Sequence, residues 1–146
     1  MPRTIPQELS DLIVDFLHND IAALCNVGLV CKSWLPASRV HLFSDITLSA
    51  MFNVHHALEV ICAEGSTIPP YISHLEMEND ESQSVDETLL RLPLLSNLKC
   101  LRFISIDMAD FTPDAKKRLT TMSERLTTLS LYDFKVRNYS FLPYLH

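Results

Sequence analysis

The chain has 146 residues, of which 47% are apolar, and its formal net charge is −6. This length suits one domain or two very small ones, the apolar content excludes a disordered tail, and the acidic balance argues against a nucleic-acid ligand, whose phosphates require a basic surface. The chain has only two glycines, Gly28 and Gly65, which excludes Walker loops, dinucleotide-binding turns and nucleophile elbows, because each needs closely spaced glycines.

Residues 6–17 carry the pattern of an amphipathic helix. Thr4 and Gln7 have the spacing of a capping box at its start, and Pro6 suits the first turn. Apolar side chains recur at i, i+3, i+4, i+7 and i+8. These positions are Leu9, Leu12, Ile13, Phe16 and Leu17.

Two further short helices are expected before residue 43. Asp20 can cap a helix over residues 21–27, and Gly28 is expected to end it. A third helix is expected over residues 30–41. Pro36 lacks an amide hydrogen and crowds the preceding turn, so it predicts a kink or a restart there.

A repeat follows from residue 43 onward. The stretches FSDITL, ISHLEM, LKCLRF and LTTLSL share the pattern apolar-x-x-apolar-x-apolar, with central positions Ile46, Leu75, Leu101 and Leu129. The steps between these positions are 29, 26 and 28 residues, inside the window of about 20–29 residues that is typical of leucine-rich repeats. We therefore expect three to four strands in residues 43–146.

Helix-like stripes separate these strands. Ser84 with Glu87 predicts a capping box, and Thr112 predicts an N-cap followed by a first-turn proline. Each strand–helix unit can bury its apolar face only against a neighbour, so we expect a parallel sheet on one side and helices on the other. The stripes are Val54, Ala57, Leu58 and Ile61; Val85, Leu89 and Leu92; and Ala115, Leu119 and Met122.

Residues 1–42 resemble an F-box, the adaptor-binding module of Skp-cullin-F-box ubiquitin ligases. The stretch LVCKSW, residues 29–34, matches the family's Val-Cys-x-x-Trp, and the tail WLPASRVHLFSDITL is similar to fungal members, in which the last helix runs into the first repeat strand. Together with the repeats, the resemblance implies an α/β fold class, a three-helix F-box followed by a short leucine-rich-repeat solenoid. The other matching residues are Ile5, Pro6, Glu8, Leu9, Ile13, Leu17 and Leu24.

The resemblance implies a substrate receptor rather than an enzyme. The F-box would bind a Skp-type adaptor, and through it a cullin, while the repeats would bind a protein target; it implies no cofactor, nucleic acid or membrane partner. A leucine-rich scaffold without a ubiquitin role, or a truncated family fragment, stays the alternative. Carried over residue by residue, the predicted adaptor surface is Ile5, Pro6, Leu9, Ile13, Leu17, Val30, Cys31, Lys32 and Trp34.

Strand alternation predicts which repeat residues point outward. If Leu75 and Met77 point into the core, their neighbours point away from it, and Glu76 should lie beside Arg102. Repeat proteins bind through such a face, although on a short array it can simply be solvated. This candidate substrate face comprises His74, Glu76, Glu78, Arg102, Ile104, Ser130 and Tyr132.

The remaining reactive side chains favour no catalytic or metal site. Cys31 lies beside Lys32, but no residue at a telling position supplies a base, so packing or an interface is the expected role. His55, His56 and Glu59 do not match a zinc motif. The acidic run over residues 76–87 lacks the glycine of a calcium loop and is expected to be a solvated edge or a charged recognition surface.

The ends of the chain and its cysteines complete the expectations. Four cysteines without a C-x-x-C pair indicate reduced thiols. The first residues do not read as a secretory signal, so we expect a cytoplasmic or nuclear protein. The final stretch, SFLPYLH, stops part-way into a further repeat, which suggests a C-terminally incomplete array.

Overall fold

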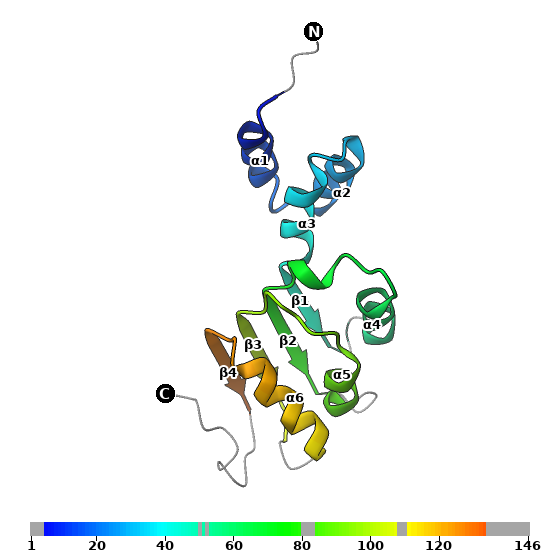
Figure 1. The fold of residues 1–146 in the computed structure, drawn as a ribbon, viewed down its shortest axis with the longest axis vertical. Helices are drawn as coiled ribbons and strands as arrows, with labels where there is room; N and C mark the ends of the chain where they lie inside the picture. Colours follow the sequence, from blue (N-terminus) through cyan, green and yellow to red (C-terminus); the bar gives the residue numbers. More distant parts are fainter. Residues whose placement is uncertain (1–4, 50, 52, 80–83, 108–110, 134–146) are drawn as a thin grey trace. The chain divides into compact units, whose positions relative to one another are not determined.

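The computed structural model describes residues 5–49, 51, 53–79, 84–107 and 111–133, which fold into two compact units, Met1–Asp45 and Ile46–His146. Within these described residues there are six α-helices, one short 3-10 helix and a four-stranded parallel sheet (Figure 1). The expected α/β class is confirmed. None of the helices in the described part of the chain is long and apolar enough to cross a membrane.

Three helices form the first unit, α1 (Gln7–Phe16), α2 (Ile21–Val30) and α3 (Leu35–Phe43). Its interior is small: Val14 and Leu24 are the only large apolar side chains in the described part of this unit that are buried, together with Ser10 and Ser38. A core of this size contributes little stability compared with that of a full domain. The fold of the helical unit therefore depends on few buried apolar contacts.

Helix α2 corrects one sequence expectation. Asp20 caps it as predicted, since its Oδ1 accepts the Ala23 amide hydrogen bond at 2.9 Å. Gly28, however, lies inside the helix rather than ending it, and a Cβ there would lie 3.5 Å from Leu35 Cδ1 and 3.6 Å from Ser38 Cβ. These are ordinary contact distances, so α3 packs beside Gly28 without requiring a glycine there, and the helix continues through it to Val30 despite the local preference of glycine for a helix end.

Helix α3 begins at Leu35, five residues later than expected, because residues 32–34 form a turn. Pro36 lies in its first turn, where the missing amide has no helical partner to lose. The predicted restart near Pro36 is thus confirmed. At the start of α1, Pro6 occupies the N-cap position without a side-chain cap, and Thr4 lies outside the described residues.

The second unit contains a sheet with strand order β1-β2-β3-β4, in which β2, β3 and β4 pair in parallel. Each strand lies beside its sequence neighbours, as a repeating strand–helix chain requires. Figure 1 shows α4, α5 and α6 on one side of this sheet. The elements are β1 (Asp45–Leu48), α4 (Val54–Cys62), η1 (Pro69–Tyr71), β2 (His74–Glu78), α5 (Val85–Arg91), β3 (Cys100–Ile104), α6 (Pro113–Ser123) and β4 (Thr128–Tyr132).

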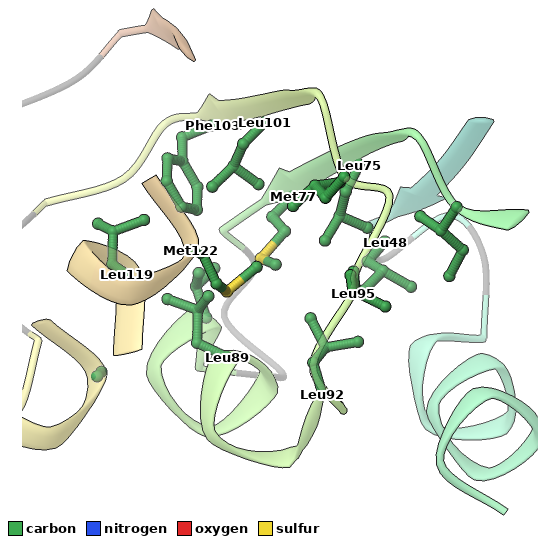
Figure 2. Packing of buried hydrophobic residues seen from close by; sticks show 14 of the residues in the cluster. Leu48, Leu75, Met77, Leu89, Leu92, Leu95, Leu101, Phe103, Leu119 and Met122 are labelled. Carbon is green, nitrogen blue, oxygen red and sulfur yellow. The ribbon is translucent and has the colours of Figure 1, made fainter. Parts of the chain in front are cut away.

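The core of this unit lies between the sheet and the helices (Figure 2). Alternate residues of β2 and β3 point into it, and the predicted helix stripes supply the opposite side. Phe103 is fully buried and meets Phe111 edge to face, with ring centroids 6.3 Å apart. The strand residues are Leu75, Met77, Leu101 and Phe103, and their helical partners include Leu58, Ile61, Leu89, Ala115, Leu119 and Met122.

The same backbone hydrogen bonds recur where successive strands begin. The Ser73 carbonyl accepts the Lys99 and Cys100 amides at 2.8 and 3.0 Å, and the Lys99 carbonyl accepts the Thr127 and Thr128 amides at 2.8 and 3.0 Å. The paired strands are offset by 26 residues between β2 and β3 (His74 to Cys100) and by 28 between β3 and β4 (Cys100 to Thr128). A structural unit of this length therefore repeats along the chain.

The strand ends repeat as well. The Asn79 amide donates to the Ile104 carbonyl at 3.1 Å, and the Ser105 amide donates to the Tyr132 carbonyl at 2.9 Å. Ser105 and Asp133, which directly follow β3 and β4, both adopt positive φ, 56° and 48°. Equivalent residues thus adopt the same unusual backbone conformation, which turns the chain away from the sheet.

The helix starts of this unit are only partly as predicted. Thr112 caps α6, since its Oγ1 accepts the Ala115 amide at 3.3 Å. Ser84 occupies the N-cap position of α5 but makes no side-chain cap hydrogen bond, so the predicted capping box is wrong. The acidic residues Asp86 and Glu87 lie in the first turn of α5, where their negative charges interact favourably with the positive end of the helix dipole.

Candidate functional site

The helical unit exposes many large apolar side chains. Phe16 is 79% exposed and Leu29 is 85% exposed, so neither side chain belongs to a hydrophobic core. Exposed apolar side chains that gather on one unit are typical of an interaction surface in soluble proteins. The other exposed members in α1 and α2 and beside them are Ile5, Leu9, Leu12, Ile13, Ile21 and Val30.

Helix α1 explains why its apolar stripe faces outward. The buried side chains of this helix are Ser10 and Val14, which lie about 100° further round the axis than Leu9 and Ile13. The small Ser10 side chain turns back toward the Pro6 carbonyl at 3.4 Å. The sequence periodicity correctly identifies an apolar stripe, but the adjacent face of α1 is the one that packs.

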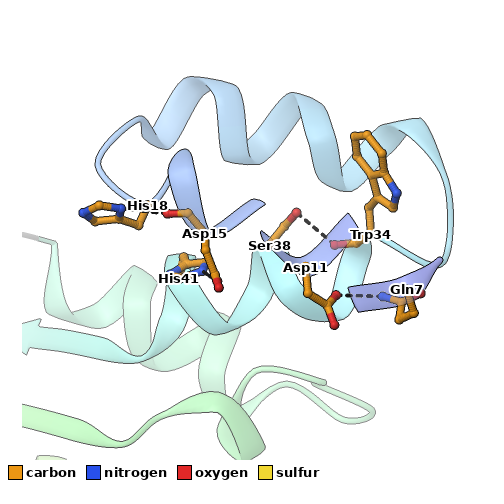
Figure 3. Close-up of polar contacts among 7 residues, drawn as sticks. All are labelled: Gln7, Asp11, Asp15, His18, Trp34, Ser38 and His41. Atoms are coloured by element: carbon orange, nitrogen blue, oxygen red, sulfur yellow. Dashed lines mark hydrogen bonds and ion pairs between the residues drawn. The ribbon is translucent and has the colours of Figure 1, made fainter. Parts of the chain in front are cut away.

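The structure brings the two ends of the predicted adaptor surface together. Gln7 Nε2 donates to the Ser33 carbonyl at 3.2 Å. It also donates to Asp11 Oδ1 at 2.7 Å (Figure 3). The start of α1, with the exposed Ile5 and Pro6, therefore lies beside the turn that joins α2 to α3. That turn and the last residue of α2 carry Val30, Cys31, Lys32 and Trp34, of which the first three are exposed.

Two members of this set need separate description. Trp34 is half-buried, and its backbone carbonyl accepts the Ser38 hydroxyl at 3.0 Å, so α3 holds the backbone of this residue and part of the side chain stays accessible (Figure 3). Leu17 is also half-buried, but it follows the other end of α1, roughly 15 Å along the helix axis. It does not join the residues at the start of α1.

An ionisable pair that sequence reasoning missed links α1 to α3. Asp15 Oδ1 lies 2.8 Å from His41 Nε2, with exposed fractions of 61% for the aspartate and 23% for the histidine (Figure 3). The His18 ring lies 6.4 Å from the His41 ring, and its Nδ1 lies 2.8 Å from the Asp15 carbonyl. The two residues are 26 positions apart in the chain, so no local sequence pattern predicts their contact.

The thiols show no catalytic arrangement. Cys31 is exposed, and its Sγ lies 3.0 Å from the Ser33 hydroxyl, which lowers the pKa of the thiol. Desolvation of Cys62 raises its pKa, against the opposing effect of Arg91 and Arg118. All four cysteines are free. A nucleophile also needs a positioned base, and no histidine or carboxylate is hydrogen-bonded to Cys31 among the described residues.

The candidate substrate face occupies the side of the sheet opposite α4, α5 and α6. Arg102 Nη1 donates to Glu76 Oε2 at 2.8 Å, as the alternation predicts, and this carboxylate raises the pKa of the guanidinium. The guanidinium carbon also lies 5.7 Å from the centre of the Tyr132 ring. The three side chains therefore connect β2, β3 and β4 on one face.

The strand register arranges the rest of this face in rows. Glu76, Arg102 and Ser130 align across β2, β3 and β4, and Glu78, Ile104 and Tyr132 form the next row. His74, at the start of β2, is exposed. Ile104 and Ser130 are only half-buried, so the face offers apolar, charged and hydroxyl groups to solvent.

Metal-binding side chains do not gather in the described part of the chain, where no three histidine, cysteine or acidic residues could hold an ion. His55 and His56 are exposed on α4, and His56 Nδ1 lies 3.8 Å from Glu59 Oε2. This is the weak contact of a solvated helix surface. Part of the acidic run, residues 80–83, lies outside the described residues.

Comparisons with family models, with curated proteins and with solved structures gave no match to this chain. Two surfaces therefore remain to indicate its function, the exposed apolar surface of the helical unit and the polar face of the sheet. Both present side chains that a partner could contact, large apolar groups on the first and charged, hydroxyl and aromatic groups on the second.

Proposed function

We propose that this protein is the substrate receptor of a Skp-cullin-F-box ubiquitin ligase. Its helical unit would bind the Skp-type adaptor, and its sheet unit would bind a protein target. The observation that carries the proposal is the exposure of large apolar residues on a helical unit in which, among the described residues, Val14 and Leu24 are the only large apolar side chains that are buried. The order of F-box-like residues in the same 42 positions agrees with it.

Physical argument supports a bound partner. Complete burial of an exposed side chain as large as Phe16 or Leu29 would contribute about 1.5–3 kcal/mol to the free energy of binding. A standard protein interface covers about 800 Å² on each partner, enough to shield such residues over the surface of a unit of this size. The turn at residues 31–34 supplies Trp34, the kind of residue that often anchors an interface.

The repeating hydrogen bonds support the second half of the proposal. Strand starts at Ser73 and Lys99 accept equivalent amide pairs, as the units of a solenoid do. The open sheet face with Glu76, Arg102 and Tyr132 is the surface on which such proteins hold a partner. Ubiquitin transfer itself would be carried out by other subunits of the ligase.

The test is binding to a purified Skp-type adaptor by isothermal titration calorimetry. Leu9→Glu with Ile13→Glu removes two exposed apolar contacts without touching Val14, the buried residue of the same helix. We expect the affinity to fall at least about 100-fold, since the two lost contacts together exceed about 2.7 kcal/mol. Val60→Glu changes a residue of α4 that is 42% exposed and serves as the matched control.

The outcomes separate the proposal from its alternative. Adaptor binding that is lost in the α1 variant and kept in the Val60→Glu control supports the ligase role. A wild-type chain that is folded by circular dichroism yet does not bind the adaptor excludes it and leaves a repeat scaffold. Trp34→Ala should weaken binding further if the open part of the ring contacts the adaptor.

A further inference from the structure

A groove of about 260 Å³ lies between α5 and α6, on the helix side of the sheet unit and opposite the candidate substrate face. Apolar side chains form part of its wall, and charged side chains of α6 form another part. The residues that matter here are Leu90, Leu94 and Met122, and Asp114, Lys117 and Arg118.

Two leucines of the apolar wall lie outside the buried core. Leu90 is 44% exposed and Leu94 is 58% exposed, whereas the adjacent Leu89, Leu92 and Leu95 are buried in the core. The exposed leucines therefore stand on the groove side of the same segment. They provide apolar area that is still accessible to a ligand.

The charged wall carries a cation that has no carboxylate partner among the described residues. Arg118 Nη2 donates to the Leu92 carbonyl, and its Nε is buried without a hydrogen-bond partner among the described residues. No carboxylate lies within ion-pair distance of Arg118 or Lys117 in the described part of the chain, although Asp114 lines the same groove. A partly buried cation without an anion is costly, so a carboxylate placed here would be stabilised.

The charge of this groove is opposite to that of the whole chain. Asp114, Lys117 and Arg118 together carry a charge of about +1, whereas the chain carries −6. Charge complementarity therefore favours an acidic ligand at this place on an acidic protein. The volume lies below the roughly 300–1,000 Å³ of pockets that enclose a small molecule, and it is suited to a few side chains of a longer segment.

We propose that this groove binds a protein segment in which a large apolar residue stands next to an acidic one. The apolar side chain would pack between Leu90, Leu94 and Met122, and the carboxylate would pair with Lys117 and the guanidinium of Arg118. The site is independent of the proposed ligase role, since it uses none of the residues of the predicted adaptor surface or the candidate substrate face.

The probes are two acetylated twelve-residue peptides that differ only in charge, one of alternating leucine and glutamate pairs and one with lysine in place of glutamate. Binding is followed through the methyl resonance of Met122 in protein labelled with ¹³C-methyl methionine, and by fluorescence anisotropy of tagged peptides. We expect the glutamate peptide to shift the Met122 resonance and the lysine peptide to leave it unchanged.

Two variants locate the site. Lys117→Glu reverses an exposed charge on the groove wall and should weaken the glutamate peptide at least about tenfold, the scale of one close charge pair. Arg125→Glu makes the same charge change on an exposed residue that does not line the groove and should have little effect. Leu94→Ala should weaken the peptide as well.

Several results would overturn the assignment. The groove is not an acidic-peptide site if neither peptide moves the Met122 resonance at millimolar concentration, if both peptides bind equally, or if both charge variants weaken binding to the same extent. A shift produced by dodecanoate but not by the peptide would assign the groove to an apolar carboxylate ligand instead.

Discussion

The link between the first turns of α5 and α6 provides a sharp test of how the sheet unit holds together. Thr112 donates to Asp86 Oδ1 twice, from its amide nitrogen at 2.7 Å and from its hydroxyl at 3.0 Å, while the hydroxyl oxygen also accepts the Ala115 amide. One carboxylate on α5 thus holds the residue that caps α6. Removing it should loosen α6 without disturbing the buried core.

The expected losses in the free energy of unfolding follow from the kinds of hydrogen bond that each variant removes. Asp86→Ala should lower the free energy of unfolding by about 1.5 kcal/mol, the lower end for a hydrogen bond to a charged group, because the carboxylate is only partly buried. Thr112→Ala should cost about 1 kcal/mol through loss of the cap. Because the two residues share a bond, the double variant should fall short of the sum by about 0.5–1 kcal/mol.

The assay is urea denaturation followed by circular dichroism, with hydrogen exchange of the Ala115 amide measured by NMR. A loss of about 1.4 kcal/mol in the local opening free energy corresponds to tenfold faster exchange. Asp86→Asn keeps an acceptor oxygen and should lose less. Glu87→Ala removes a charge from the same turn of α5, but Glu87 makes none of these bonds, so it should change stability by less than about 0.5 kcal/mol.

Equal effects of Asp86→Ala and Glu87→Ala would show that the loss reflects helix-end charge alone and not the bonds to Thr112. Additivity of the Asp86 and Thr112 variants within about 0.3 kcal/mol would likewise show that the two residues are not coupled.

Two further predictions concern the helical unit and the thiols. Gly28→Ala should stabilise the protein by about 0.5–1 kcal/mol, because alanine is the better residue inside a helix and its Cβ would meet Leu35 and Ser38 at ordinary contact distances of 3.5 and 3.6 Å; a lower urea midpoint in the variant would show that the α2–α3 interface cannot accept a methyl group. Iodoacetamide at pH 8 should modify Cys31 faster than Cys62, because the Ser33 hydroxyl lowers the pKa of Cys31 and desolvation raises the pKa of Cys62. Peptide mapping by mass spectrometry measures both rates, and Ser33→Ala should slow Cys31 alone.

Local patterns predicted much of the sheet unit. The repeated apolar motif places Leu75 and Leu101 in the core, and strand alternation is enough to bring Glu76 beside Arg102. The first apolar residue of a motif lies before its strand: Ile72 and Leu98 are buried in the segments that lead into β2 and β3. These features depend on neighbours at fixed offsets, which a repeat makes visible in the sequence.

The features that escaped prediction depend on contacts between distant residues. Periodicity identifies the apolar stripe of α1, yet only the tertiary packing of this helix decides that Val14 is buried and Ile13 is exposed. Gly28 is predicted to end α2, yet the helix continues to Val30 and packs Gly28 beside Leu35 and Ser38 of α3. The Asp15–His41 pair has no sequence signal, because its members belong to different helices.

The backbone hydrogen bonds that precede β3 and β4 follow the same pattern, so one strand–helix unit could be removed and the next strand could pair in its place. Ser73 and Lys99 each offer their carbonyl to an equivalent pair of amides. A chain from which residues 74–99 were excised would bring Ser73 directly before Cys100 and let β3 take the place of β2. Removing a single residue would instead exchange inward and outward side chains along a strand. Length in this unit can therefore change in whole steps of 26 or 28 residues, and natural length variants should differ by such steps.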